Sequence, residues 1–91
     1  MRVLVHTFFM TLLVTGGAGF IGSNFVLDWL ALSDEPIVNL DALTYAGNLH
    51  NLDALKGDAR HVFVQGDIND RALVDRLLAE QRPRAIVHLA A

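Results

Sequence analysis

Short apolar segments alternate with longer amphipathic segments along the chain. Four segments rich in Val, Leu and Ile predict β-strands, over residues 11–15, 36–41, 61–65 and 85–91. The first of them is apolar on both faces, which is typical of a parallel strand covered on each side. We therefore expect these strands to form a parallel sheet with helices packed on both faces.

The segments between the strands have helical spacing. Residues 20–32 predict a helix, ended by the sequence Ser33–Pro36, whose apolar stripe is Ile21, Phe25, Val26, Trp29 and Leu30. Residues 71–81 predict a second helix with four inward residues, Leu73, Val74, Leu77 and Leu78. Asn69 or Asp70 caps its start and Pro83 ends it. Leucines at 49, 52 and 55 predict a short helix that closes near Gly57.

Strands that alternate with helices predict β-α-β units with right-handed crossovers. We expect an α/β fold of the Rossmann type with strand order 3-2-1-4, which is the first part of a doubly wound parallel sheet. A complete sheet of this kind has further strands, so the domain is expected to be a partial one over residues 10–91, truncated after the fourth strand. Residues 1–9 are expected to be an N-terminal extension.

The apolar start of the chain does not predict a membrane segment. Residues 1–14 loosely resemble a secretory signal peptide, but His6 interrupts them and no cleavage site follows. The segment is also shorter than the roughly 20 apolar residues that span a bilayer. The net charge of −3 and the dispersed basic residues argue against a nucleic-acid binder, and the absence of Cys excludes thiolate chemistry.

A glycine cluster interrupts the chain directly after the first predicted strand. The sequence is TGGAGFIGS, so Gly16 allows a tight turn, Gly19 lets the backbone approach a diphosphate, and Gly22 permits close packing of the helix. The amides of Phe20 and Ile21 are the expected donors to that anion, at a helix N-terminus. The alternative is a glycine-rich turn that only packs tightly.

Asp41 indicates which nucleotide this cluster binds. It ends the second predicted strand, 19 residues after Gly22, and a carboxylate there accepts hydrogen bonds from ribose hydroxyls. It also repels a 2′-phosphate, and no Arg or Lys lies at 42–48, so NAD is favoured over NADP. The alternative is a solvated acid at the strand end. An ATP-binding P-loop is excluded because the only Lys is Lys56.

Three motifs resemble the extended short-chain dehydrogenase/reductase superfamily: TGGAGFIGS, GDI at 66–68 and HLAA at 88–91. The sequence NLDALTYAGNLHNL at 39–52 resembles the signature of the dTDP-glucose 4,6-dehydratase family, in which a D-x-L-T-Y-A-G-N run follows the second strand. UDP-glucose 4-epimerases share the glycine fingerprint and are the alternative.

The resemblance implies further cofactor contacts. Leu43 and Thr44 would line the adenosine side, with Tyr45 beside them, and Asp67 and Ile68 would contact the adenine. At the end of the fourth strand, Leu89, Ala90 and Ala91 would lie beside the ribose and the diphosphate. Alternatively, Asp67 is a helix cap, Leu89 and Ala90 are core strand residues, and Tyr45 only packs its ring. His88 is expected to be a core histidine, and the histidine spacing predicts no metal site.

The resemblance also implies chemistry that this sequence does not supply. In the family, a Tyr-x-x-x-Lys pair and an Asp-Glu pair act with NAD to oxidise the sugar at C4, eliminate water and return the hydride to C6. The only Tyr is Tyr45, so no Tyr-x-x-x-Lys pair exists. The Asp-Glu pair Asp34–Glu35 lies in the loop before the second predicted strand, far from the expected nicotinamide, so no catalytic residue is assigned. We expect this chain to be the N-terminal portion of a nucleotide-sugar dehydratase that is cytoplasmic and homodimeric. The chain alone is expected to be inactive and to bind NAD weakly. A non-catalytic NAD-binding module is the alternative.

Overall fold

The computed structural model describes residues 11–43 and 49–89. Within these ranges the strands are β1 (Leu12–Thr15), β2 (Ile37–Asp41), β3 (His61–Gln65) and β4 (Ala85–His88). The helices are α2 (Phe20–Leu32) and α3 (Arg71–Gln81), and η1 (Leu49–Leu55) is a 3₁₀ helix. All predicted elements are present. The fourth strand ends at His88 rather than running to residue 91, and residues 90–91 lie outside the described ranges.

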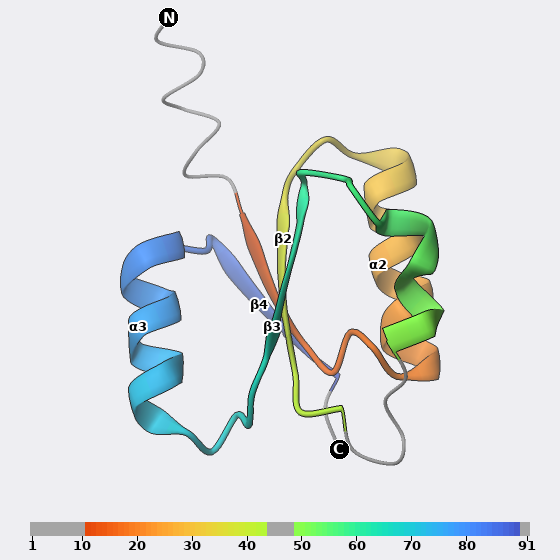
Figure 1. The fold of residues 1–91 in the computed structure, drawn as a ribbon. Coiled ribbons are helices and arrows are strands. Elements are labelled where there is room, and N and C mark those ends of the chain that lie inside the picture. Colours follow the sequence, from red (N-terminus) through yellow and green to blue (C-terminus); the bar gives the residue numbers. More distant parts are fainter. Residues whose placement is uncertain (1–10, 44–48, 90–91) are drawn as a thin grey trace, which may run out of the picture.

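The strands form one parallel sheet with the order β3-β2-β1-β4, which confirms the predicted topology. The pairs Leu12–Ile37 and Leu12–Ala85 set the register of β1 with its two neighbours. Because all strands run the same way, their carboxyl ends meet at one edge of the sheet (Figure 1). The loops that carry the candidate site residues leave from this edge.

Helices cover the sheet on both faces. In Figure 1, α2 and η1 lie on one side of the sheet and α3 on the other. Leu12 and Val14 of β1 pack toward α2, whereas Leu13, between them, belongs to the cluster that contains Leu77 of α3. The four residues of β1 are all buried, so the prediction of a strand covered on each side is confirmed.

The structure corrects the predicted apolar stripe of α2. Ile21 was expected to face inward, but its side chain is 71% exposed, and the buried residues of α2 are Gly22, Ser23, Val26 and Leu30. The inward face is therefore rotated from Ile21 toward Gly22, because the helix start packs against the glycine turn. In α3, Leu77 is buried as predicted, whereas Leu78 is exposed.

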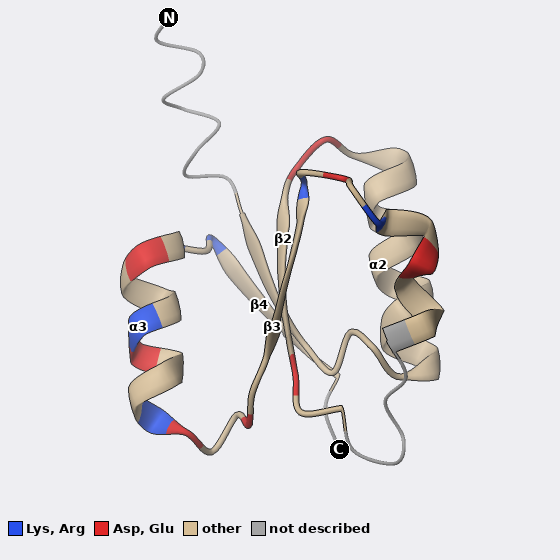
Figure 2. Ribbon diagram, in the orientation of Figure 1, with Lys and Arg blue, Asp and Glu red and all other residues tan. Residues whose placement is uncertain are grey.

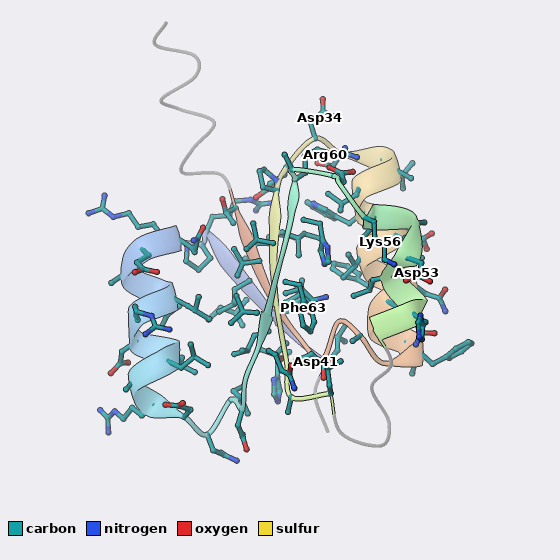
Figure 3. The ribbon with its side chains drawn as sticks, viewed as in Figure 1. Asp34, Asp41, Asp53, Lys56, Arg60 and Phe63 are labelled. Carbon is teal, nitrogen blue, oxygen red and sulfur yellow. The ribbon has the colours of Figure 1, made fainter. Side chains whose placement is uncertain are left out.

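Side chains fix the ends of both helices. Asp70 caps α3 by accepting a hydrogen bond from the amide of Leu73 at 3.2 Å, which decides between the two predicted caps. At the C-terminal end of α2, Arg60 donates to the carbonyl of Leu30 at 2.9 Å (Figure 3). The same guanidinium binds Asp58 and lowers the pKa of that carboxyl from 3.8 to about 2.

Charged residues are distributed over the described part of the chain. Figure 2 shows acidic and basic positions alternating along α3, and further basic positions just before β3, near the start of β4 and close to η1. Arg84 and Glu35 form a bidentate ion pair at 2.6 and 2.9 Å, which ties the start of β4 to the loop before β2. No described helix is both long and apolar enough to cross a bilayer.

Candidate functional site

The carboxyl edge of the sheet gathers the predicted site residues from separate parts of the sequence. The glycine turn follows β1, Asp41 ends β2, Asp67 follows β3 and Leu89 follows β4. Figure 3 shows Asp41 at the end of β2, close to the loop that leads into α2. In doubly wound sheets, ligands bind at this edge, where neighbouring connections run to opposite faces.

The glycine turn has the tight geometry that was predicted for it. Gly16 has φ of +78°, which an L side chain rarely adopts, and its amide donates to the carbonyl of Leu40 at 2.9 Å. Gly19 then precedes the first residue of α2 as the N-cap and has no side chain to cap the helix. The helix start therefore has no side chain between its amides and an approaching ligand.

Gly22 permits close packing of α2 against this turn, as predicted. A Cβ atom built on Gly22 would lie 2.8 Å from the Cα of Gly17, and nearer still to the carbonyl oxygen of Gly16. Real Cβ atoms do not approach backbone so closely. A side chain at 22 would push the first turn of α2 away from β1 and from the amides around it.

The first turn of α2 presents free backbone donors. The first helical hydrogen bond runs from the amide of Ser23 to the carbonyl of Gly19, at 2.8 Å. Among the described residues, none accepts from the amides of Phe20, Ile21 or Gly22. The side chains of Phe20 and Ile21 are 77% and 71% exposed, so they leave the helix end accessible. Such an end favours an anion.

Asp41 lies against the glycine turn. Its Oδ2 accepts a hydrogen bond from the amide of Ala18 at 2.8 Å, and its Oδ1 accepts from the amide of Leu43 at 2.8 Å. The carboxylate is buried with both oxygens engaged, and each ionised oxygen has a further lone pair. The acceptor expected for ribose hydroxyls therefore stands beside the donors expected for a diphosphate.

Leu43 and Leu89 border this edge. Leu43 has φ of +57°, in the left-handed region, because its amide turns back to Asp41. Leu89 is 37% exposed, and its amide donates to the carbonyl of Thr15 at 2.8 Å. Thr44, Tyr45, Ala90 and Ala91 lie outside the described residues, so their predicted contacts stay predictions.

The loop after β3 presents the predicted adenine contacts. Ile68 is 40% exposed. Asp67 is exposed, and its Oδ1 accepts from the amide of Asn69 at 2.8 Å, so part of the carboxylate closes the turn before α3. His88 was expected in the core, but it is exposed, and its Nδ1 lies 2.6 Å from Oγ1 of Thr15. It shares a face of β4 with Ile86, which is also exposed, so this face of the strand is not covered by other described residues.

Sequence reasoning missed Asn51. This residue belongs to η1, and its Nδ2 donates to the carbonyl of Ala18 at 3.0 Å across 33 positions of sequence. The packing of η1 against α2 brings the two together, so the position of Asn51 in the sequence does not indicate this contact. Among the described residues, no group of His, Cys, Asp and Glu is arranged to hold a metal ion.

Known proteins match most of this chain in sequence. The model of the GDP-mannose 4,6 dehydratase family matches residues 13–91. A curated dTDP-glucose 4,6-dehydratase of Xanthomonas campestris is 60% identical over 81 residues, which are 89% of this chain and 23% of that protein. The chain thus spans about a quarter of the length of the curated relatives it matches.

Solved structures show the same likeness. The dTDP-glucose 4,6-dehydratase of Bacillus anthracis, in complex with NAD, has 44% identity and a TM-score of 0.87, over 90% of this chain and 27% of that one. The UDP-Glc/GlcNAc 4-epimerase of Campylobacter jejuni has 33% identity and a TM-score of 0.80, over 90% and 24%. The dehydratases are therefore more similar than this epimerase, which was the alternative.

Proposed function

Since the chain belongs to the GDP-mannose 4,6 dehydratase family, we propose that it binds NAD as the N-terminal portion of a dTDP-glucose 4,6-dehydratase. That enzyme would convert dTDP-glucose into its 4-keto-6-deoxy product. The NAD-bound neighbours and the similarity of the curated relatives support this assignment.

One observation carries the proposal. The amide of Ala18, inside the glycine turn, donates to Asp41 Oδ2 at 2.8 Å, so the two halves of an adenosine diphosphate site are adjacent. The free amides of Phe20 and Ile21 donate hydrogen bonds to the diphosphate oxygens, and Asp41 accepts hydrogen bonds from the ribose diol. A 2′-phosphate would meet the Asp41 carboxylate, which favours NAD over NADP.

The remaining contacts follow the same edge of the sheet. Asp67 and Ile68 receive the adenine, and Leu43 and Thr44 cover the adenosine. Leu89, Ala90 and Ala91 pass the ribose and diphosphate. These residues bind and orient the cofactor, and none of them is a base or proton donor for the sugar.

When bound, NAD would accept a hydride from the sugar and later return it. The chain contains one Tyr and one Lys, Tyr45 and Lys56, and their spacing of 11 does not form the Tyr-x-x-x-Lys pair. The groups that move protons would therefore come from beyond residue 91 of the whole enzyme. We also propose a cytoplasmic location and a homodimeric whole enzyme, with a nucleotide sugar as substrate.

NMR titration of the ¹⁵N-labelled chain with NAD and NADP tests the cofactor assignment. Millimolar ligand detects weak binding. We expect NAD to shift the amide signals of residues 19–22 and NADP to bind at least about tenfold more weakly, because like charges meet at Asp41. Asp41→Asn should reduce this preference, whereas Asp75→Asn, an exposed change on α3, should not. Circular dichroism verifies that both variants are folded.

Two outcomes would contradict the proposal. One is the absence of any NAD-dependent shift at residues 19–22 in the folded chain. The other is an NAD preference that the Asp41→Asn variant retains in full.

A further inference from the structure

Two side chains from distant parts of the sequence hold the backbone of Ala18. Its amide donates to Asp41 Oδ2 at 2.8 Å, and its carbonyl accepts from Asn51 Nδ2 at 3.0 Å. Asp41 ends β2, whereas Asn51 comes from η1, which lies alongside α2 (Figure 1). Ala18 is fully buried, at the centre of the glycine turn.

This arrangement sets the direction of the peptide group between Ala18 and Gly19. In a trans peptide the carbonyl and the following amide point in opposite directions, and the described chain contains no cis bond. With the Ala18 carbonyl bound to Asn51, the Gly19 amide points instead to the carbonyl of Gly16, at 3.3 Å. Without Asn51, the long 3.3 Å bond from the Gly19 amide to Gly16 would be the one contact left to this peptide among the described residues, so the peptide could rotate.

Rotation of this peptide would matter for an anion. A carbonyl oxygen that turned toward the first turn of α2 would place a partial negative charge next to the free amides of Phe20 and Ile21. It would also change the position of Gly19, whose extended backbone starts the helix. The glycines give this turn little conformational preference of its own, so an external contact is needed to order it.

We infer that Asn51 is a positioning residue for the cofactor's diphosphate, and this inference rests on the proposed NAD-binding function. Asn51 touches no ligand in this assignment. Its side-chain amide orders the Ala18–Gly19 peptide, so that the amides at the start of α2 are fixed before the anion arrives. Asp41 binds the amide of Ala18, whereas among the described residues Asn51 is the side chain that binds its carbonyl.

Two substitutions at 51 and one matched control test this role. Asn51→Ala removes the donor, and Asn51→Asp keeps the shape but replaces the donor with an acceptor. Asn24→Ala is the control, since Asn24 is an exposed asparagine on α2 with no recorded side-chain bond to a described residue. Circular dichroism and urea unfolding verify that each variant is folded.

The first measurement uses the ligand-free chain. We expect both Asn51 variants to shift or broaden the NMR amide signals of residues 18–20 and to speed the hydrogen exchange of the Gly19 amide. Asn24→Ala should change only signals near position 24. Unchanged signals at residues 18–20 in both Asn51 variants would overturn the inference, whether or not the chain binds NAD.

The second measurement is the affinity for NAD and for adenosine, which lacks the diphosphate. Loss of one hydrogen bond should raise the Kd for NAD about three- to tenfold and leave that for adenosine unchanged. An equal loss for both ligands would show a merely structural role and overturn the inference. If the original chain does not bind NAD, the proposed function is wrong. The first measurement then decides by itself whether Asn51 orders the glycine turn.

Discussion

Asn39 Nδ2, in β2, lies 3.3 Å from Nε2 of His61, in β3. Asn39 is fully buried, and its Oδ1 has no hydrogen-bond partner among the described residues. The bond joins β2 to the edge strand β3. Because Asn39 donates, His61 Nε2 accepts, which requires the neutral imidazole. Burial lowers the pKa of His61 below 6.5, in agreement with this state.

Acidification should therefore destabilise the fold through His61. As the pH falls through 6.5, the unfolded chain binds a proton at His61 that the folded chain resists, so the free energy of unfolding decreases. Urea unfolding between pH 7.5 and 5.5 measures this decrease. His61→Gln should flatten the pH dependence relative to the original chain. The same slope in His61→Gln and in the original chain would refute the assignment.

A second acidic transition should come from Asp58. Its pKa of about 2 means that the carboxylate bound to Arg60 stabilises the fold above pH 3.8, and that this stabilisation is lost as the pH falls toward 2. Asp58→Asn should remove this part of the acid transition, as followed by circular dichroism. Asp75→Asn, on the exposed face of α3, should retain it. An unchanged acid transition in Asp58→Asn would contradict the prediction.

Gly22→Ala should destabilise the fold by about 1–3 kcal/mol, because the new methyl group overlaps the turn at Gly16 and Gly17. Urea unfolding measures the loss. The comparison is Gly57→Ala, where the added Cβ meets no atom within 4 Å but φ is +82°. Gly57→Asn should lose less stability than Gly57→Ala, because Asn tolerates a positive φ. At position 22, by contrast, every side chain should destabilise the fold. A stable Gly22→Ala variant would disprove the close packing.

The edge at β4 should promote self-association. Within the described residues β4 pairs only with β1, and Ile86 on this strand is 55% exposed. Sedimentation of the 91-residue chain should show association that grows with concentration and is weakened by Ile86→Lys. Leu32→Lys is the control, because Leu32 is 89% exposed on α2. A compact monomer at all concentrations, or equal effects of both substitutions, would exclude this edge.

The sequence by itself determined the elements and their order. Strands and helix starts follow from local periodicity, caps and glycines, and these are short-range properties. For this reason α2 and β3 have the predicted bounds, and Gly16 and Gly22 have the predicted roles in the turn. The order of the parallel strands followed from the same connections.

Only the tertiary structure decided which side chains from distant segments meet. It rotated the buried face of α2 away from Ile21, and it left His88 at the exposed end of β4. It also brought Asn51 to the carbonyl of Ala18, 33 positions away, and Asn39 to His61, 22 positions away. Such contacts depend on how helices and strands pack in three dimensions, and no periodicity or spacing along the chain encodes them.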